Sequence, residues 1–272
     1  MKKELGSDDL ATLMDRPPLN LEYKVVNTDR NIGTRLAGRV AEIYGNNGLP
    51  NGTINLTVNG SSGQSLGTFL CSGINIRAVG EANDYVGKGM AGGQIIVQPS
   101  ENINFDPADN SIVGNTCLYG ATGGNLYVNG RGGERFGVRN SGATAVCEGV
   151  GDHGAEYMTN GLLLILGITG KNFGAGMSGG SAFVYDIDGR FQSRINAEMV
   201  APLPIQRAED IQLVKELIEK HIELTGSSRA KNILDNWDKS VKKFIRVIPK
   251  QVAELEAAEE THEAASTPQV GA

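Results

Sequence analysis

Two glycine-rich stretches contain residue patterns that carry chemistry in many enzymes. "GKGMAGG" at residues 87–93 and "GAGMSGG" at residues 174–180 both fit G-x-G-x-x-G, the pattern of dinucleotide-binding turns. The second stretch also fits G-x-S-x-G, in which Ser178 would be the nucleophile of a hydrolase. His221 and His262 follow Ser178 in the chain order of a hydrolase triad. The patterns therefore raise two enzyme hypotheses, a dehydrogenase and an esterase.

A polar cluster, "GDHGAEY" at residues 151–157, brings Asp152, His153 and Glu156 close together in the sequence. Such residues can serve as acid, base or metal ligand. In a strand, however, this spacing places alternate side chains on opposite faces, which makes a poor ligand set. The cluster is predicted to be a turn held by side-chain hydrogen bonds, or a contact with a partner.

The three cysteines, Cys71, Cys117 and Cys147, lie 46 and 30 residues apart. This is neither a metal-site nor an iron–sulfur spacing. An odd number of cysteines in a cytoplasmic chain also argues against a disulfide framework. All three are predicted to be small buried hydrophobic residues.

The elements that must position these residues are short apolar runs, each of which follows a glycine. Their leading glycines are separated by 21, 20, 31, 18, 19 and 19 residues, and the long interval holds the polar insertion "PSENINFDPADN". The runs are rich in Val, Ile, Leu and Thr, which predicts strands. The seven runs are "GTINLTVNG", "GINIRAVG", "GQIIVQP", "GNLYVNG", "GATAVCEG", "GLLLILG" and "GSAFVYD", from Gly52, Gly73, Gly93, Gly124, Gly142, Gly161 and Gly180.

A constant short period means that each unit must stack on its neighbours to bury its apolar face. No helix-length pattern separates the runs, so the prediction is a parallel β-helix of about seven coils, with no βαβ crossovers. At roughly 4.8 Å per coil, the rod would be on the order of 34 Å long. A sustained six-residue period is missing, which argues against the left-handed hexapeptide type.

The repeat also explains the glycine patterns without any ligand. A dinucleotide turn and a nucleophile elbow both need a helix after the turn, whereas both stretches here precede an apolar strand. Ala91 occupies the position of Ser178 in the earlier copy. His221 falls in a predicted helix and His262 in a polar tail. The glycines are therefore predicted to be corners of the repeat, and no catalytic, cofactor-binding or metal-binding residue is assigned.

The composition changes after Pro204. Residues 208–226 and 228–244 have helical patterns, with Gly226 as a stop and Ser227 as an N-cap. This predicts a helical hairpin on the side or end of the β-helix, and "KFIRVIPKQ" is read as one more strand. The predicted organisation is a lead-in segment at 1–20, the β-helix domain at 21–206, a helical extension at 207–250 and a disordered acidic tail at 251–272.

Charge and hydropathy exclude several classes of partner. The formal net charge is −6, which argues against nucleic acid as a partner. No run of about 18 apolar residues could span a membrane, and "MKKELGSDDL" has no apolar stretch typical of a secretory signal. The expectation is a soluble cytoplasmic protein.

Several long stretches resemble one known family. They include "LEYKVVNTDRNIGTRLAG", "GEANDYVGKGMAGG", "GERFGVRNSGATAVCEGVGDHGAEYMTNG" and "HIELTGSSRAKNILDNW". Over roughly residues 21–250 the chain resembles the C-terminal domain, with the GXGXG motif, of the glutamate synthase large subunit. The resemblance implies a right-handed parallel β-helix without an active site of its own.

The resemblance also implies a function and partners. The chain would be a scaffold for a class II glutamine amidotransferase and an FMN-binding synthase, which make two glutamates from glutamine, 2-oxoglutarate and a reductant. FMN and an iron–sulfur cluster would belong to those partner domains or subunits, with no cofactor in this chain. Two alternatives remain, a β-helix subunit of a formylmethanofuran dehydrogenase type of complex and a serine hydrolase using Ser178. "NTDR" and "GDHG" favour glutamate synthase.

Overall fold

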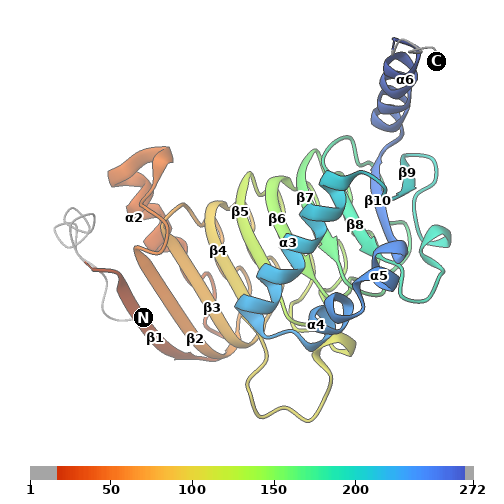
Figure 1. Cartoon of the computed structure of the whole chain (residues 1–272). Helices are drawn as coiled ribbons and strands as arrows, with labels where there is room; N and C mark the ends of the chain where they lie inside the picture. The colour runs from red at the N-terminus through yellow and green to blue at the C-terminus, as the bar shows by residue number, and fades with distance from the viewer. Residues whose placement is uncertain (1–16, 267–272) are drawn as a thin grey trace.

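A single ten-stranded sheet dominates the protein (Figure 1). The computed structural model describes residues 17–266, with side chains through residue 259. The strand order is β1-β2-β3-β4-β5-β6-β7-β8-β10-β9. The strands are β1 Leu19–Val25, β2 Ile54–Ser62, β3 Ile74–Ala82, β4 Ala91–Gln98, β5 Gly123–Val128, β6 Ser141–Cys147, β7 Asn160–Ile165, β8 Ser181–Tyr185, β9 Val200–Pro204 and β10 Phe244–Pro249.

Helix α2 lies between the first two strands, and the other α-helices follow β9 in the sequence. The α-helices are α2 Thr34–Tyr44, α3 Ala208–Thr225, α4 Ser228–Asp235, α5 Trp237–Ser240 and α6 Lys250–Ser266. The short 3-10 helices are η2 Gly45–Asn47, η3 Pro107–Asp109, η4 Phe191–Ser193 and η5 Val241–Lys243.

The seven predicted strands are confirmed as β2 to β8. Each pairs in parallel with the next, as shown by Ile54 opposite Ile74 and by Ile76 opposite Ile95. In the links between β2 and β8, all of which the structure describes, no α-helix occurs. The polar insertion between β4 and β5 forms a loop that carries only η3.

The links contain six five-residue turns in which the first, third and fifth residues have positive φ. The first of these turns has Ser65 at φ 68°, Gly67 at 67° and Phe69 at 56°. Among the described residues, eleven of the twelve non-glycine residues with positive φ lie in these turns, Asn31 being the other. We call this set the turn ladder; it consists of residues 65–69, 85–89, 116–120, 135–139, 153–157 and 172–176.

Successive turns of the ladder are joined by backbone hydrogen bonds. Gly87 N donates to Leu66 O at 2.9 Å, and Leu118 N donates to Val86 O at 2.8 Å. The same pattern continues where Gly137 N donates to the Cys117 carbonyl at 2.9 Å. Because each repeat thus binds its neighbours through both its strand and its turn, the backbone polar groups of the turns are satisfied between repeats.

Two apolar layers flank the sheet. The larger core contains side chains from the strands, such as Ile76 and Leu126, together with Val86 and Leu118 of the turn ladder, so it lies between sheet and ladder. On the other face, α3 lies across the sheet and contacts β4, β5 and β6 (Figure 1). The second core joins that face to the helices through residues such as Ile218.

The expected all-β, parallel β-helix fold is met only in part. The protein is mostly β, but a helix, α2, connects the parallel strands β1 and β2, and the pattern of short runs gave no sign of it. The sheet is open, with β1 and β9 as its edges. The strands β9 and β10 pair in antiparallel fashion, which the repeat did not predict.

In the C-terminal third, the first predicted helix is present as α3, whereas the second, expected over 228–244, is divided into α4, α5 and η5. Helix α3 ends at Gly226, whose φ is 68°, and Ser227 Oγ accepts a hydrogen bond from Ala230 N at 2.9 Å as the N-cap of α4. The predicted additional strand is confirmed as β10, which lies between β8 and β9 and so belongs to the sheet itself.

The segment 251–272 differs from the expected disordered tail. Residues 250–266 form α6, and residues 267–272 lie outside the described part of the chain. Arg246 of β10 forms a two-bond fork with Glu256 of α6, with distances of 2.8 and 2.9 Å. This ion pair gives the first half of the helix a fixed partner, which the acidic composition alone did not reveal. The four-part division of the chain stays a prediction.

Candidate functional site

Both glycine-rich stretches belong to the turn ladder. Gly87 and Gly89 have φ of 67° and 63°, and Gly174 and Gly176 have φ of 77° and 68°. The strands β4 and β8 follow directly, so neither stretch opens a helix that could face a pyrophosphate. A Cβ added to Gly89 would lie 2.6 Å from Cε1 of Phe69. The glycines are therefore needed for backbone conformation and close approach, as the repeat predicted.

Ser178 and the two histidines do not form a triad. Ser178 is exposed just before β8, and its backbone N donates to the preceding repeat, as Ala91 N does at the start of β4. His221 is fully buried in α3 and bonds to Glu148 instead. His262 lies in the backbone range of α6, beyond the last described side chain. The hydrolase hypothesis thus lacks its geometry among the described residues.

The "GDHG" cluster is a turn held by side-chain hydrogen bonds, which confirms the first of its two predicted roles. Asp152 Oδ1 accepts a bond from Lys171 N at 2.7 Å. Glu156 forms an ion pair with Arg135 of the preceding turn. His153, at φ 62°, has its Nδ1 3.9 Å from Glu156 Oε1. The contacts of Asp152 and Glu156 join successive repeats, whereas the His153–Glu156 contact lies within one turn.

Equivalent residues in other repeats make the same bond. Asp84 Oδ1 accepts from Asn115 N at 2.8 Å, and Asn115 Oδ1 accepts from Glu134 N at 2.7 Å. A side-chain oxygen that caps the next turn is thus a repeated device of this fold.

The cysteines are neutral thiols. Burial raises the pKa of the Cys147 thiol to about 12, and it raises the pKa values of Cys117 and Cys71 as well. Cys147 Sγ donates to the Gly149 carbonyl at 3.1 Å. All three are free, with Cys117 and Cys147 buried and Cys71 half-buried. Because a thiolate is the reactive and metal-binding form, the raised pKa values leave these residues as small hydrophobic side chains. Burial is as predicted for Cys117 and Cys147 but only partial for Cys71.

A buried cluster around one carboxylate, which the sequence patterns did not indicate, lies between the sheet and the helices. Glu148, directly after β6, is 1% exposed, and His221 of α3 is 0% exposed. Glu148 Oε1 accepts from Ser227 Oγ and lies 3.3 Å from His221 Nε2. The ring of Tyr127 stacks on His221 with centroids 6.2 Å apart.

This cluster has the residue types of a hydrolase triad, but their arrangement serves to hold the helices on the sheet and not to catalyse a reaction. Serine and histidine both bind the same carboxylate oxygen, and all three groups are buried. A nucleophile needs a base at hydrogen-bond distance and access for a substrate. The cluster instead fastens the start of α4 and the middle of α3 to the sheet.

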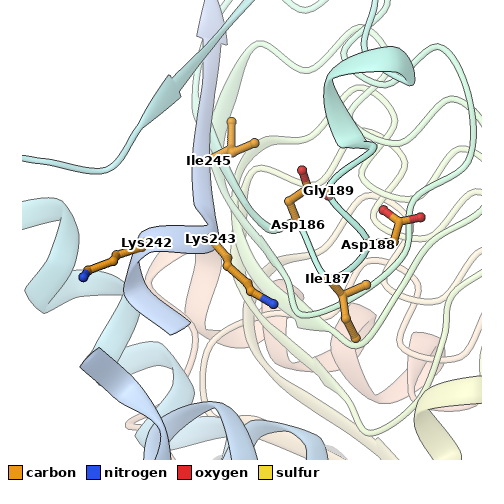
Figure 2. A pocket seen from close by; sticks show the side chains of 7 residues that line it. All are labelled: Asp186, Ile187, Asp188, Gly189, Lys242, Lys243 and Ile245. Carbon is orange, nitrogen blue, oxygen red and sulfur yellow. The ribbon is translucent and has the colours of Figure 1, made fainter. Parts of the chain in front are cut away.

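One cavity, of about 470 Å³, lies between the 186–189 turn and the start of β10. Figure 2 shows Lys243 pointing toward this turn, whereas Lys242 points away from it. The Arg194 guanidinium bonds to Asp188 and holds the pKa of that carboxyl below its usual value. Asp186 Oδ1 accepts from the backbone of residues 190 and 191, both at 3.1 Å. Both carboxylates therefore stabilise the turn.

A second cavity, of about 720 Å³, lies at the first strands, between β1, β2 and α2. Its walls combine Leu21, Leu56 and Val58 with the side chains of Arg30 and Arg39. Within residues 17–259, no group of three or more His, Cys, Asp or Glu side chains is placed to hold a metal ion. None of the described helices has both the length and the apolar character needed to cross a bilayer.

The protein is therefore a repeat protein in which each repeat contributes one parallel strand and one tight turn, with helices packed on the opposite face of the sheet. The chain belongs to the GXGXG motif family, whose pattern matches residues 3–250. It is 52% identical over 227 residues to ferredoxin-dependent glutamate synthase 2 of Synechocystis sp.. It is 47% identical to the glutamate synthase [NADH] of Schizosaccharomyces pombe over 251 residues, and 47% to the glutamate synthase [NADPH] large chain of Bacillus subtilis over 247.

These alignments cover most of this chain but a small part of each relative. They include 84%, 91% and 90% of the chain, respectively, and 14%, 12% and 16% of the relatives. The chain thus corresponds to one segment of a much longer protein in each case.

Proposed function

We propose that this chain is a non-catalytic scaffold in a glutamate synthase-type assembly, which converts glutamine, 2-oxoglutarate and a reductant into two glutamates. The observation that supports the proposal most directly is the identity of 47–52% with three glutamate synthases over 84–91% of the chain. Its partners would be a class II glutamine amidotransferase and an FMN-binding synthase. FMN and an iron–sulfur cluster would be bound by those parts.

The names of the relatives suggest that this segment does not determine which electron donor the enzyme uses. They are described as ferredoxin-dependent, NADH and NADPH enzymes, and all three contain a closely similar segment. A segment common to three electron donors is not expected to recognise any of them. This supports a role in holding other parts in place.

We further infer that the repeats are the coils of a right-handed parallel β-helix. The support is the one-strand-per-repeat parallel pairing from β1 to β8, together with the hydrogen-bonded turn ladder. Seven steps of about 4.8 Å give a stack of roughly 34 Å. A stack bonded along two sides is a stiff spacer, which is the property that a scaffold between two enzymes requires.

The alternatives have less support. A serine hydrolase would need a base beside Ser178, and His221 is buried and bonded elsewhere. A formylmethanofuran dehydrogenase type of complex matches none of the relatives named above. A cytoplasmic location and the four-part domain division remain predictions.

The test is to isolate the affinity-tagged chain from its own cells. We expect it to carry with it a flavin-containing protein and glutamine-dependent glutamate synthesis. The chain purified alone after recombinant expression should be colourless and should bind neither FMN nor NAD(P)H. Isolation from its own cells without flavin or an amidotransferase would refute the proposal, and a flavin band retained by the recombinant chain through gel filtration would refute its non-catalytic role.

A further inference from the structure

The first strand of the stack leaves one end of the main core uncovered. Strand β1 is an edge of the sheet, and with α2 it forms one end of the molecule (Figure 1). Leu21 and Tyr23 of β1 stand opposite Leu56 and Val58 of β2. The two β2 side chains are 2% and 0% exposed, whereas those of β1 are only half-buried. Since no described strand pairs with the outer side of β1, its inward side chains are the open end of the core.

The cavity of about 720 Å³ lies at this open end. Its apolar walls come from both sides of the core, with Leu21, Leu56 and Val58 from the strands and Leu36 from α2. A stack of repeats needs a cap with a polar outer face wherever its core would otherwise meet water. The walls of the cavity are therefore a surface on which such a cap would pack.

The charged residues that line the cavity are mostly cationic. They are Lys24, Arg30, Arg35 and Arg39, with Asp29 as the single acidic residue of the lining. Asp29 keeps its charge while Oδ2 accepts a bond from Val26 N at 2.9 Å, and Glu42, one turn further along α2, pairs with Arg39. Four cations against these two carboxylates leave a surplus of two positive charges. The lining thus suits an occupant that combines apolar side chains with carboxylates.

The chain that precedes β1 has the matching composition. Residues 4–15, "ELGSDDLATLMD", contain four carboxylates and no Lys or Arg. Three large apolar side chains, Leu10, Leu13 and Met14, stand among these carboxylates. The segment lies outside the described part of the chain. Its sequence supplies both kinds of group that the cavity would bind.

The same segment is tethered at the cavity. Leu13 precedes Leu19, the first residue of β1, by six positions, and six extended residues reach up to about 20 Å. Packed layers of a protein lie roughly 10 Å apart, so the tether is long enough for Leu13 to enter. A segment on a short tether acts at an effective concentration in the millimolar range. Separate molecules, including the acidic α6 of a second copy, lack this advantage.

We propose that residues 4–15 are an intramolecular cap that binds in this cavity. The apolar side chains of the segment cover Leu21 and Leu56, and its carboxylates face the arginines of the lining. The cap closes the end of the core to other chains and turns its remaining polar groups outward. This proposal goes beyond the scaffold function and does not depend on it.

The reactivity of a cysteine placed in the segment tests the cap in the whole chain. Leu13→Cys is labelled with a thiol reagent, and peptide mass spectrometry follows this site separately from the three native thiols. The same cysteine in a free peptide of residues 1–18 gives the rate without a cap. Leu255→Cys, at a side chain of α6 that is 65% exposed, is the control for the reagent.

Two double variants remove the charge match from either side. Asp8→Lys with Asp9→Lys changes the segment, and Arg30→Glu with Arg35→Glu changes the lining. All four substitutions together restore opposite charges across the cavity.

We expect Leu13→Cys to react at least about tenfold more slowly in the chain than in the peptide, at a rate that does not depend on protein concentration. Each double variant should bring the rate to within about threefold of that of the peptide, and the combined variant should recover most of the protection. Asp235→Lys with Asp238→Lys, at exposed positions of α4 and α5, is the matched control and should leave the rate unchanged.

Three results would overturn the cap. One is a Leu13→Cys rate within about twofold of that of the peptide. Another is protection that neither double variant weakens, because the segment would then bind elsewhere. The third is protection that increases with protein concentration, which would assign the cavity to a second copy of the chain. The scaffold proposal would stand in each case, since it is tested by co-isolation of a flavin-containing partner.

Discussion

Substitution of Gly161 by valine should destabilise the whole stack. Gly161, the second residue of β7, has φ of 90°, where a β-branched residue is strained by about 1–3 kcal/mol. Its added Cβ would lie 2.5 Å from Ala143 O and 2.7 Å from Asn140 Nδ2. The Asn140 side chain is buried and bonds to Ala143 O at 2.8 Å and Ala143 N at 2.9 Å. Displacing that amide would leave buried polar groups unpaired, at about 1–3 kcal/mol.

The total expected loss is therefore about 2–6 kcal/mol in the free energy of unfolding, which reaches the upper range for a point substitution. Gly120→Val is the matched control for backbone strain alone, since Gly120 has φ of 65° and no atom within 4 Å of an added Cβ. Gly38→Ala, inside α2 and with the same open space, should stabilise by about 0.5–1 kcal/mol.

Chemical denaturation of the three variants, followed by circular dichroism, measures these differences. Gly161→Val should lose about 2 kcal/mol more than Gly120→Val, because the two share the strain and differ in the clash with the neighbouring repeat. Equal losses in the two variants would show that close stacking of repeats does not fix the glycines. An unchanged midpoint for Gly161→Val would refute the turn-and-stack explanation altogether.

Three further changes test other parts of the structure. Glu148→Ala removes the common partner of the buried His221 and Ser227 side chains, so the midpoint of denaturation should reflect a loss of about 1–3 kcal/mol for each group left unpaired. Ser178→Ala should leave any measured ester hydrolysis unchanged, since Ala91 already occupies the equivalent position of an earlier repeat and His221 is bonded to Glu148. Glu256→Gln should lower the thermal midpoint near neutral pH, because the Arg246 fork holds the pKa of Glu256 below 4.5 and this stabilisation is lost as the pH falls through the lowered pKa.

Each of these expectations has a contrary result. An unaltered denaturation midpoint for the Glu148 variant would mean that the cluster contributes nothing to holding the helices. A hundredfold fall in the rate of hydrolysis for Ser178→Ala, about 2.7 kcal/mol in the barrier, would establish a nucleophile there. A Glu256 variant whose difference from the wild type persists at strongly acidic pH would contradict the ion-pair explanation.

The strands could be predicted because their signal is local and repeated. Runs such as "GLLLILG" begin with a glycine, which permits a turn, and continue with apolar residues that must be buried. The spacing of about 20 residues indicated that successive runs lie in neighbouring repeats. The same reasoning assigned Ala91 and Ser178 to one structural position, which the two matching backbone bonds confirm.

The non-glycine residues of the turn ladder could not be predicted in the same way. Leu118 and Ala155 have φ of 59° and 58°, against their own local preference. Only the hydrogen bonds to the neighbouring turns, such as Leu118 N to Val86 O, impose that conformation. A sequence window that contains a single repeat does not include those partners.

The buried carboxylate cluster was missed for a related reason. Glu148 meets its partners across 73 and 79 positions of sequence, and nothing near any of them marks the encounter. Helix α2 was missed because its N-cap, Gly33, forms no side-chain capping bond. A search for capping signals would not have found its start.

The place of β10 between β8 and β9 imposes an order of events on a newly made chain. Strands β1 to β8 can join the sheet one after another as they leave the ribosome, since each finds its partner in the preceding repeat. Strand β9 is made next but has no neighbour until β10, which begins 40 positions after Pro204, has been synthesised. Until then the free side of β8 can pair with another nascent chain, and unpaired edges of this kind favour aggregation. A truncation anywhere between residues 205 and 244 would make that temporary hazard permanent.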